Sequence, residues 1–104
     1  MWTEESIKKL CEALEIPSAF LFFDTPQVPP YLIVRMDDSA NIHSDLEMLQ
    51  TRDTYGLELY YRNPKDRKAF EKILTEYLLW QRFSTDTSIG QDGVLMSYYE
   101  PAIN

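Results

Sequence analysis

The chain has 104 residues, with 17 acidic and 10 basic side chains and a net charge of −7 at pH 7. This length fits one domain over residues 1–104, and the 44% of residues that are hydrophobic can form its core. The acidic balance argues against sequence-specific nucleic-acid binding, which usually depends on a basic stripe. A single cysteine excludes an intrachain disulfide and a thiolate zinc cage, and no apolar run approaches the roughly 20 residues that span a membrane.

The first expected element is an amphipathic helix. Its apolar stripe recurs at i, i+3, i+4 and i+7 and consists of Ile7, Leu10, Cys11 and Leu14. Thr3 suits the N-cap position. Pro17 should end the helix, because proline lacks a backbone donor and disfavours helix in the residue before it.

Four strand candidates follow. Residues 19–23 are rich in aromatic side chains, and this strand is either buried on both faces or faces a partner. Residues 31–36 form the second strand. A polar loop over 37–45 leads to a weaker candidate at 46–52. Residues 55–62 alternate with the period of two that is typical of a half-buried antiparallel strand, and a short separator favours its pairing with the preceding candidate.

A second helix and a final hairpin complete the pattern. Asn63 at the N-cap and Pro64 at the first helical position begin the helix, which should run to about Gln81 or Arg82. Its apolar stripe consists of Phe70, Ile73, Leu74, Tyr77 and Leu78. Short strands at 85–89 and 94–100 flank a turn at 90–93. The sequence predicts an α+β fold with two helices packed on one face of a mostly antiparallel sheet, in the order α-β-β-β-β-α-β-β.

The sequence offers little support for catalysis or for a cofactor. Cys11 lies on an apolar stripe, where a thiol usually serves packing, and His43 is a single histidine in a polar loop. The acidic cluster Asp37, Asp38, Asp45 and Glu47 matches no EF-hand spacing and lacks the glycine that such a loop needs. We therefore expect no enzyme, no cofactor and no metal site.

Aromatic residues are the more informative feature. Seven tyrosines and two tryptophans either mark a surface that is buried on association or reflect strand propensity, and both interpretations remain open. In Tyr60-Tyr61 and Tyr98-Tyr99, one member of each pair must face away from the helices. The expected interface residues are Tyr31, Tyr60, Tyr99 and the acidic residues Asp37, Asp38 and Asp45. Replacing Tyr60 and Tyr99 together with alanine should then leave a folded monomer that no longer assembles.

Three segments carry a family resemblance. PPYLIVR at residues 29–35, YGLELY at 55–60 and NPKD at 63–66 follow an N-terminal helix in this order. The arrangement resembles the tail-completion proteins of long-tailed bacteriophages, which are also described as tail-terminator or head–tail joining proteins. The resemblance covers nearly the whole chain and departs from the family pattern at residues 80–93.

What the resemblance implies is a structural role in the virion. Such proteins cap the head-proximal end of the tail tube as hexameric rings of α+β subunits, after assembly in the cytoplasm of the host bacterium. Their partners are copies of themselves, the tail-tube protein and a neck or connector protein. DNA passes through the ring, so a negative lining would keep phosphate from adhering.

Two other functions remain open. A neck or adaptor protein of the connector would share this fold. A small acidic cytoplasmic module could instead bind another protein, for example as an inhibitor that mimics nucleic-acid charge. An enzyme is the least favoured class, because no convergent acid, base and electrophile can be assigned.

Overall fold

A computed structural model describes residues 2–38, 53–90 and 92–102 of the chain. The elements in this part of the chain are α1 (Glu4–Ala13), β1 (Ser18–Phe20), β2 (Tyr31–Asp38), β3 (Asp53–Tyr61), α2 (Pro64–Tyr77), β4 (Trp80–Ile89) and β5 (Val94–Pro101). The strands form one sheet in the order β1-β2-β3-β5-β4, in which β1 and β2 are parallel and the other neighbours are antiparallel.

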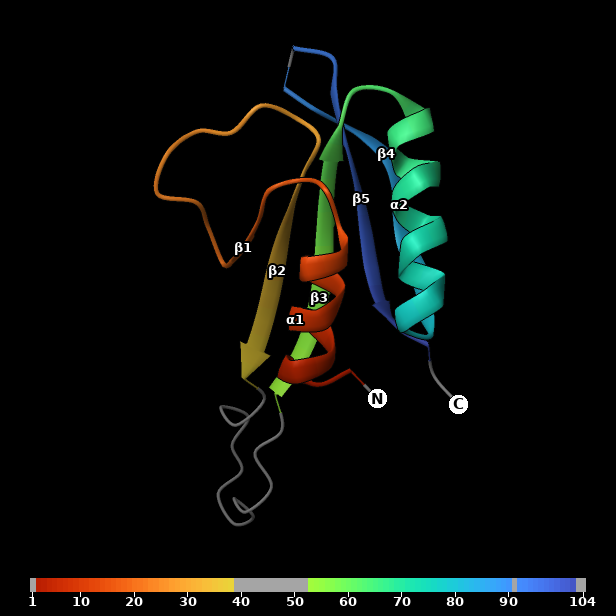
Figure 1. Ribbon diagram of the computed structural model, residues 1–104. Coiled ribbons are helices and arrows are strands. Elements are labelled where there is room, and N and C mark those ends of the chain that lie inside the picture. Colours follow the sequence, from red (N-terminus) through yellow and green to blue (C-terminus); the bar gives the residue numbers. More distant parts are fainter. Residues whose placement is uncertain (1, 39–52, 91, 103–104) are drawn as a thin grey trace.

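Both helices lie on the same side of this sheet (Figure 1). The predicted α+β fold, with two helices on one face of a mostly antiparallel sheet, is therefore confirmed. The order of the described elements is α-β-β-β-α-β-β, and the strand expected at residues 46–52 lies outside the described residues. The described part of β3 pairs with β2 on one side and β5 on the other.

Both helices begin at the caps that the sequence predicts. Thr3 Oγ1 accepts a hydrogen bond from the backbone N–H of Ser6 at 3.1 Å, and Ser6 Oγ accepts one from the N–H of Thr3 at 2.9 Å. At α2, Asn63 Oδ1 accepts from the N–H of Lys65 at 2.9 Å. Pro64 takes the first helical position, where no backbone donor is needed.

The C-terminal end of α2 comes earlier than expected. The helix ends at Tyr77 and not near residues 81–82, and Leu78 already has an extended backbone at φ −140° and ψ 151°. β4 begins at Trp80, which pairs with Pro101 of β5, whereas the sequence placed this strand at residues 85–89. Pairing with a strand far along the chain therefore overrides the helical periodicity of this segment.

β1 is also shorter than the strand expected over residues 19–23. It ends at Phe20, because Leu21 adopts the left-handed region at φ 73°. The N–H of Leu21 donates to the carbonyl of Val34 at 2.8 Å, and the chain then leaves the sheet. Residues 21–30, which we call the apolar loop, connect β1 to β2.

The core lies between the helices and the sheet face that they cover. β3 alternates as expected, and the side chains that face the helices from it are Tyr55, Leu57, Leu59 and Tyr61. Of the stripe expected on α2, Phe70, Leu74 and Leu78 are buried and Ile73 packs against the core. Tyr77, the last residue of the helix, is an exception at 45% exposure. In the part of the chain that the structure describes, neither helix is long and apolar enough to cross a membrane.

Candidate interface on the open face of the sheet

The two faces of the sheet differ in what covers them. The helices cover the face that carries Tyr61 and Tyr99, neither of which has exposed surface. Side chains alternate along a strand, so Tyr60 and Tyr98 point to the opposite face, where both are half-buried. Among the described residues no helix or further strand lies over that face (Figure 1). We call it the open face.

An aromatic row crosses the open face on the side nearest β1. Tyr31 of β2 and Tyr60 of β3 are register partners, and their rings stack with centroids 4.9 Å apart at an interplanar angle of 16°. Phe23 of the apolar loop meets Tyr31 edge-on, with centroids 5.5 Å apart at 87°. Ring pairs at these distances attract each other beyond the area that they bury. The aromatic row (Phe23, Tyr31, Tyr60) therefore forms a continuous, ordered apolar surface.

An ion pair lies next to the aromatic row. Arg35 Nη1 is 2.7 Å from Glu58 Oε2, and the Tyr60 hydroxyl donates to Glu58 Oε1 at 2.9 Å. Burial raises the pKa of Tyr60 to about 12, and the hydrogen bond to Glu58 adds to this effect. The charge of Glu58 is thus satisfied within the face, so a partner that covers the face need not supply a cation for it.

Gly56 allows Tyr98 to lie close against β3. A Cβ built at position 56 would overlap the hydroxyl and the ring of Tyr98. A glycine within a strand commonly marks such a close approach. Any larger residue at this position would push Tyr98 away from the sheet and change the shape of the open face.

The apolar loop exposes large side chains beside the aromatic row. Leu21 is 49% exposed, Phe22 66% and Val28 76%. Single exposed apolar side chains are ordinary on a protein surface. Three on the loop that also carries Phe23 add apolar surface of the kind found at interaction sites.

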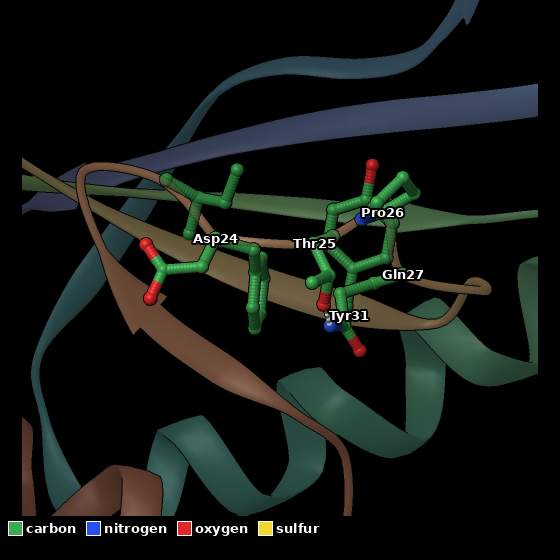
Figure 2. A pocket seen from close by; sticks show the side chains of 7 residues that line it. Asp24, Thr25, Pro26, Gln27 and Tyr31 are labelled. Carbon is green, nitrogen blue, oxygen red and sulfur yellow. Dashed lines mark hydrogen bonds between the residues drawn. The ribbon is translucent and has the colours of Figure 1, made fainter.

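A hollow of about 340 Å³ lies where the apolar loop meets the open face (Figure 2). Phe23, Tyr31 and Ile33 contribute its apolar walls. Gln27 donates to the carbonyl of Thr25 at 3.3 Å within the same loop. Asp24 is the one carboxylate among the described residues that line it. The lining therefore offers no pair of acid and base groups for catalysis, and it is better suited to receive a side chain of a partner protein.

A second cluster of polar side chains lies on the covered face. Asp86 of β4 accepts hydrogen bonds from the hydroxyl of Tyr61 and from Arg67 Nε, the latter at 3.1 Å. A bulge places Asp86 at φ 51°, and its N–H donates to Tyr61 at 3.1 Å and to Ser97 Oγ at 3.2 Å. Burial, followed by the hydrogen bond to Asp86, raises the pKa of Tyr61.

Glu71 of α2 forms the other half of this cluster. It accepts from the Tyr99 hydroxyl at 2.8 Å and lies 3.2 Å from Arg67 Nη1 and 3.6 Å from Arg82 Nε. Burial and the hydrogen bond to Glu71 raise the pKa of Tyr99 well above its usual range. Each charged group of the cluster has a partner, so the cluster acts as a joint between α2 and the sheet.

The structure brings together two of the predicted interface residues, Tyr31 and Tyr60. The prediction for Tyr99 is wrong: it has no exposed surface, because its pairing with Leu57 places it on the covered face. Asp37 and Asp38 form the end of β2. Asp45 lies outside the described residues.

The residues considered for chemistry do not converge. Cys11 packs against the core, and burial raises the pKa of its thiol, which disfavours the reactive thiolate. His43 and Glu47 lie outside the described residues. Within residues 2–38, 53–90 and 92–102, no three or more histidine, cysteine or carboxylate side chains are grouped to hold a metal ion.

Sequence reasoning missed Tyr98 and the exposed side chains of the apolar loop. The Tyr98-Tyr99 pair was a signal, but alternation alone does not tell which member faces inward. The sequence predicts residues 21 and 22 within a strand. The left-handed backbone that ends the strand occurs at Leu21, whereas glycine is the residue that usually signals this conformation.

No protein-family model, curated protein or solved structure matches the chain. What the protein does must therefore be inferred from the open face, the apolar loop and the motifs of the sequence.

Proposed function

We propose that the protein is a structural component of a bacteriophage virion that caps the head-proximal end of the tail tube and joins the tail to the head. The observation that carries this proposal is an aromatic sheet face that no helix covers in the described part of the chain, next to a loop with exposed apolar side chains. Such surfaces are typical of proteins that bury them on association. The motifs at residues 29–35, 55–60 and 63–66, which resemble those of tail-completion proteins, support the choice of this assembly.

The open face is suited to protein contact in its chemistry. Rigid aromatic rings supply contact area at a low cost in conformational entropy. The ion pair of Arg35 with Glu58 is already formed, so covering it adds no unpaired charge. A closed ring of identical subunits joins two different patches of each copy. In the proposed hexameric ring, the open face and the apolar loop form one of these patches.

The net charge of −7 also agrees with this role. A tail joint must let DNA pass without holding it, and negative surface repels phosphate. No catalytic step is required of the protein, and none of its described clusters offers an unpaired acid and base side by side. Its partners would be other copies of itself, the tail-tube protein and a neck protein.

Electron microscopy of phage particles tests the proposal. An early stop codon in this gene should give DNA-filled heads beside separate tails of irregular length, and a wild-type copy supplied in trans should restore virions. Separate tails of regular length would instead favour a neck adaptor. Normal infectious virions from the stop-codon phage would exclude the structural role and favour an accessory binding protein.

Two variants supplied in trans test whether the apolar loop carries the contact. Phe22→Asp places a charge at a side chain that is 66% exposed, and it should fail to restore virions. Leu79→Asp makes the same kind of change at a side chain that is 71% exposed but lies after α2, and it should restore them. Restoration by both variants would show that the apolar loop is not part of the contact.

A further inference from the structure

A second hollow lies on the helix side of the molecule, where the end of α1 meets α2. Its walls are apolar, with Leu14 and Ile16 on one side and Ala69 and Ile73 on the other. Its volume is about 310 Å³, and we call it the interhelix groove. An apolar cavity of about 150 Å³ can hold one benzene-sized group, so the groove has room for one or two large apolar side chains.

The groove is open because of how the two helices end and pack. α1 ends at Ala13, and the chain then turns away, which leaves the flank of α2 without a neighbouring helical turn. Ala69 presents only a methyl group on this flank and is exposed. Phe70 at 3% exposure shows that the core is closed beneath it. The groove is therefore a surface feature that a partner can fill without opening the core.

The side chains that line the groove include two carboxylates and no basic group. Glu15 and Asp66 line it, and neither has an ion-pair partner in the described part of the chain. The last turn of α1 carries no basic side chain, so the negative end of its helix dipole is not offset there. Glu12, in that last turn, is exposed and adds to the negative charge.

We propose that the interhelix groove binds a segment of a partner protein that carries an apolar side chain next to a lysine or arginine. The apolar walls would bury the first side chain, and Glu15 and Asp66 would pair with the second. A phosphate or an acidic peptide would meet like charge at these two carboxylates.

A second copy of this chain is a poorer occupant. The exposed apolar side chains of the apolar loop are accompanied by Asp24 and by no basic residue within residues 21–30. Two copies also repel each other through their net charges of −7. The groove lies across the sheet from the open face, so both surfaces can be occupied at once, and this inference does not depend on the proposed function.

A titration with a defined probe tests the groove. The probe is a synthetic amphipathic peptide of leucine and lysine, and its control is the same peptide with glutamate in place of each lysine. Binding is followed by nitrogen–proton correlation spectra of the labelled protein. We expect the lysine peptide to shift the amide signals of residues 14–16 and 66–73, and the glutamate peptide to shift none of them.

Three variants separate the groove from general attraction to an acidic protein. Ala69→Leu fills the groove without changing its charge and should weaken binding of the lysine peptide by about tenfold or more. Asp66→Asn should also weaken binding of this peptide. Glu76→Gln removes a charge from the same helix outside the groove and should leave peptide binding unchanged. Shifts spread over the whole acidic surface, or binding that Ala69→Leu does not weaken, would overturn the proposal.

Discussion

Tyr99 stabilises the fold through both its ring and its hydroxyl. The ring lies with its centroid 5.2 Å from that of Phe70 on α2 and 5.2 Å from that of Trp80 on β4. The hydroxyl donates to Glu71 at 2.8 Å. Tyr60 lies one strand away, where none of the described helices covers it, and makes its contacts on the open face. Tyr99 therefore stabilises the core, whereas Tyr60 shapes the open face.

We expect Tyr99→Ala to lower the free energy of unfolding by about 3–5 kcal/mol, the usual effect of deleting a buried aromatic ring. Tyr99→Phe should lower it by about 1–2 kcal/mol, because Glu71 keeps Arg67 as a partner. Tyr60→Ala is the control and should lower it by about 1 kcal/mol, since it removes one ring stack. Urea denaturation followed by circular dichroism measures all three, and equal losses for Tyr60→Ala and Tyr99→Ala would contradict this assignment.

This assignment corrects the expectation that the double alanine variant leaves a folded monomer. Loss of the Tyr99 ring acts on the core and would reduce assembly through unfolding alone. Tyr60→Ala by itself changes the open face, Phe22→Asp changes the apolar loop, and neither touches the core. Alternation along β5 does not reveal this, because Ser97 is polar and yet lies on the buried side, where its hydroxyl is 2.7 Å from that of Tyr61.

Tyr60 also makes the stability dependent on pH in the alkaline range. Its pKa is raised to about 12 in the folded chain, against about 10 for an unfolded tyrosine. Below about pH 10 the phenol is neutral in both states, so stability is retained; above this pH the unfolded chain loses the proton first, and the free energy of unfolding falls. The raised pKa values of Tyr61 and Tyr99 act in the same direction.

Ultraviolet absorbance of tyrosinate, recorded with circular dichroism, measures this effect. The folded protein should contain a phenol that ionises near pH 12, and Tyr60→Phe should remove it from the titration while the fold persists. Tyr31→Phe is a suitable control on the same face, because it leaves the hydrogen bond between Tyr60 and Glu58 in place. An unchanged titration in Tyr60→Phe would refute the expected pKa.

At the scale of elements, the junction between α2 and β4 shows where sequence reasoning fails. The apolar residues of α2 continue their helical spacing to Leu78, and no proline or glycine follows that would end the helix. The helix nevertheless ends at Tyr77, since Trp80 donates from its indole to Thr75 Oγ1 at 3.0 Å and enters the sheet beside β5. Such long-range pairing leaves no local signal in the sequence.

Two adjacent leucines at this junction test its geometry. Leu78 is 7% exposed and lies in the core, whereas Leu79 is 71% exposed. We expect Leu78→Ala to lower the free energy of unfolding by about 2–5 kcal/mol and Leu79→Ala to change it by about 0.5 kcal/mol or less. Equal losses for the two variants would contradict the inward placement of Leu78 and the outward placement of Leu79. Thermal or urea unfolding of the two variants distinguishes these outcomes.

At the scale of the whole molecule, the sequence was sufficient for the layer arrangement but not for the surfaces. Caps at Thr3 and Asn63 and the alternation of β3 are local signals, and the fold class follows from them. The open face depends on which member of Tyr98-Tyr99 is buried, and the interhelix groove depends on where α1 leaves the flank of α2 uncovered. Both are set by packing between elements, which periodicity does not encode.

The two proposed surfaces should respond to salt in opposite directions. Copies that each carry −7 repel one another, so contact through the aromatic row and the apolar loop should strengthen when salt screens this repulsion. Raising the ionic strength from about 0.01 M to about 0.1 M shortens the screening length from about 30 Å to about 10 Å. Attraction of a basic segment to Glu15 and Asp66 in the interhelix groove should weaken over the same range.

Sedimentation velocity of the protein alone measures the first effect, and titration with the lysine peptide measures the second. Phe22→Asp should weaken self-association at both ionic strengths, because it removes apolar contact and adds negative charge, while peptide binding should be unchanged. Self-association that weakens as salt is added would mean that ion pairs hold the copies together. In that case a charged surface would join the copies. The aromatic row would not, because Arg35 and Glu58 beside it already pair with each other within one copy.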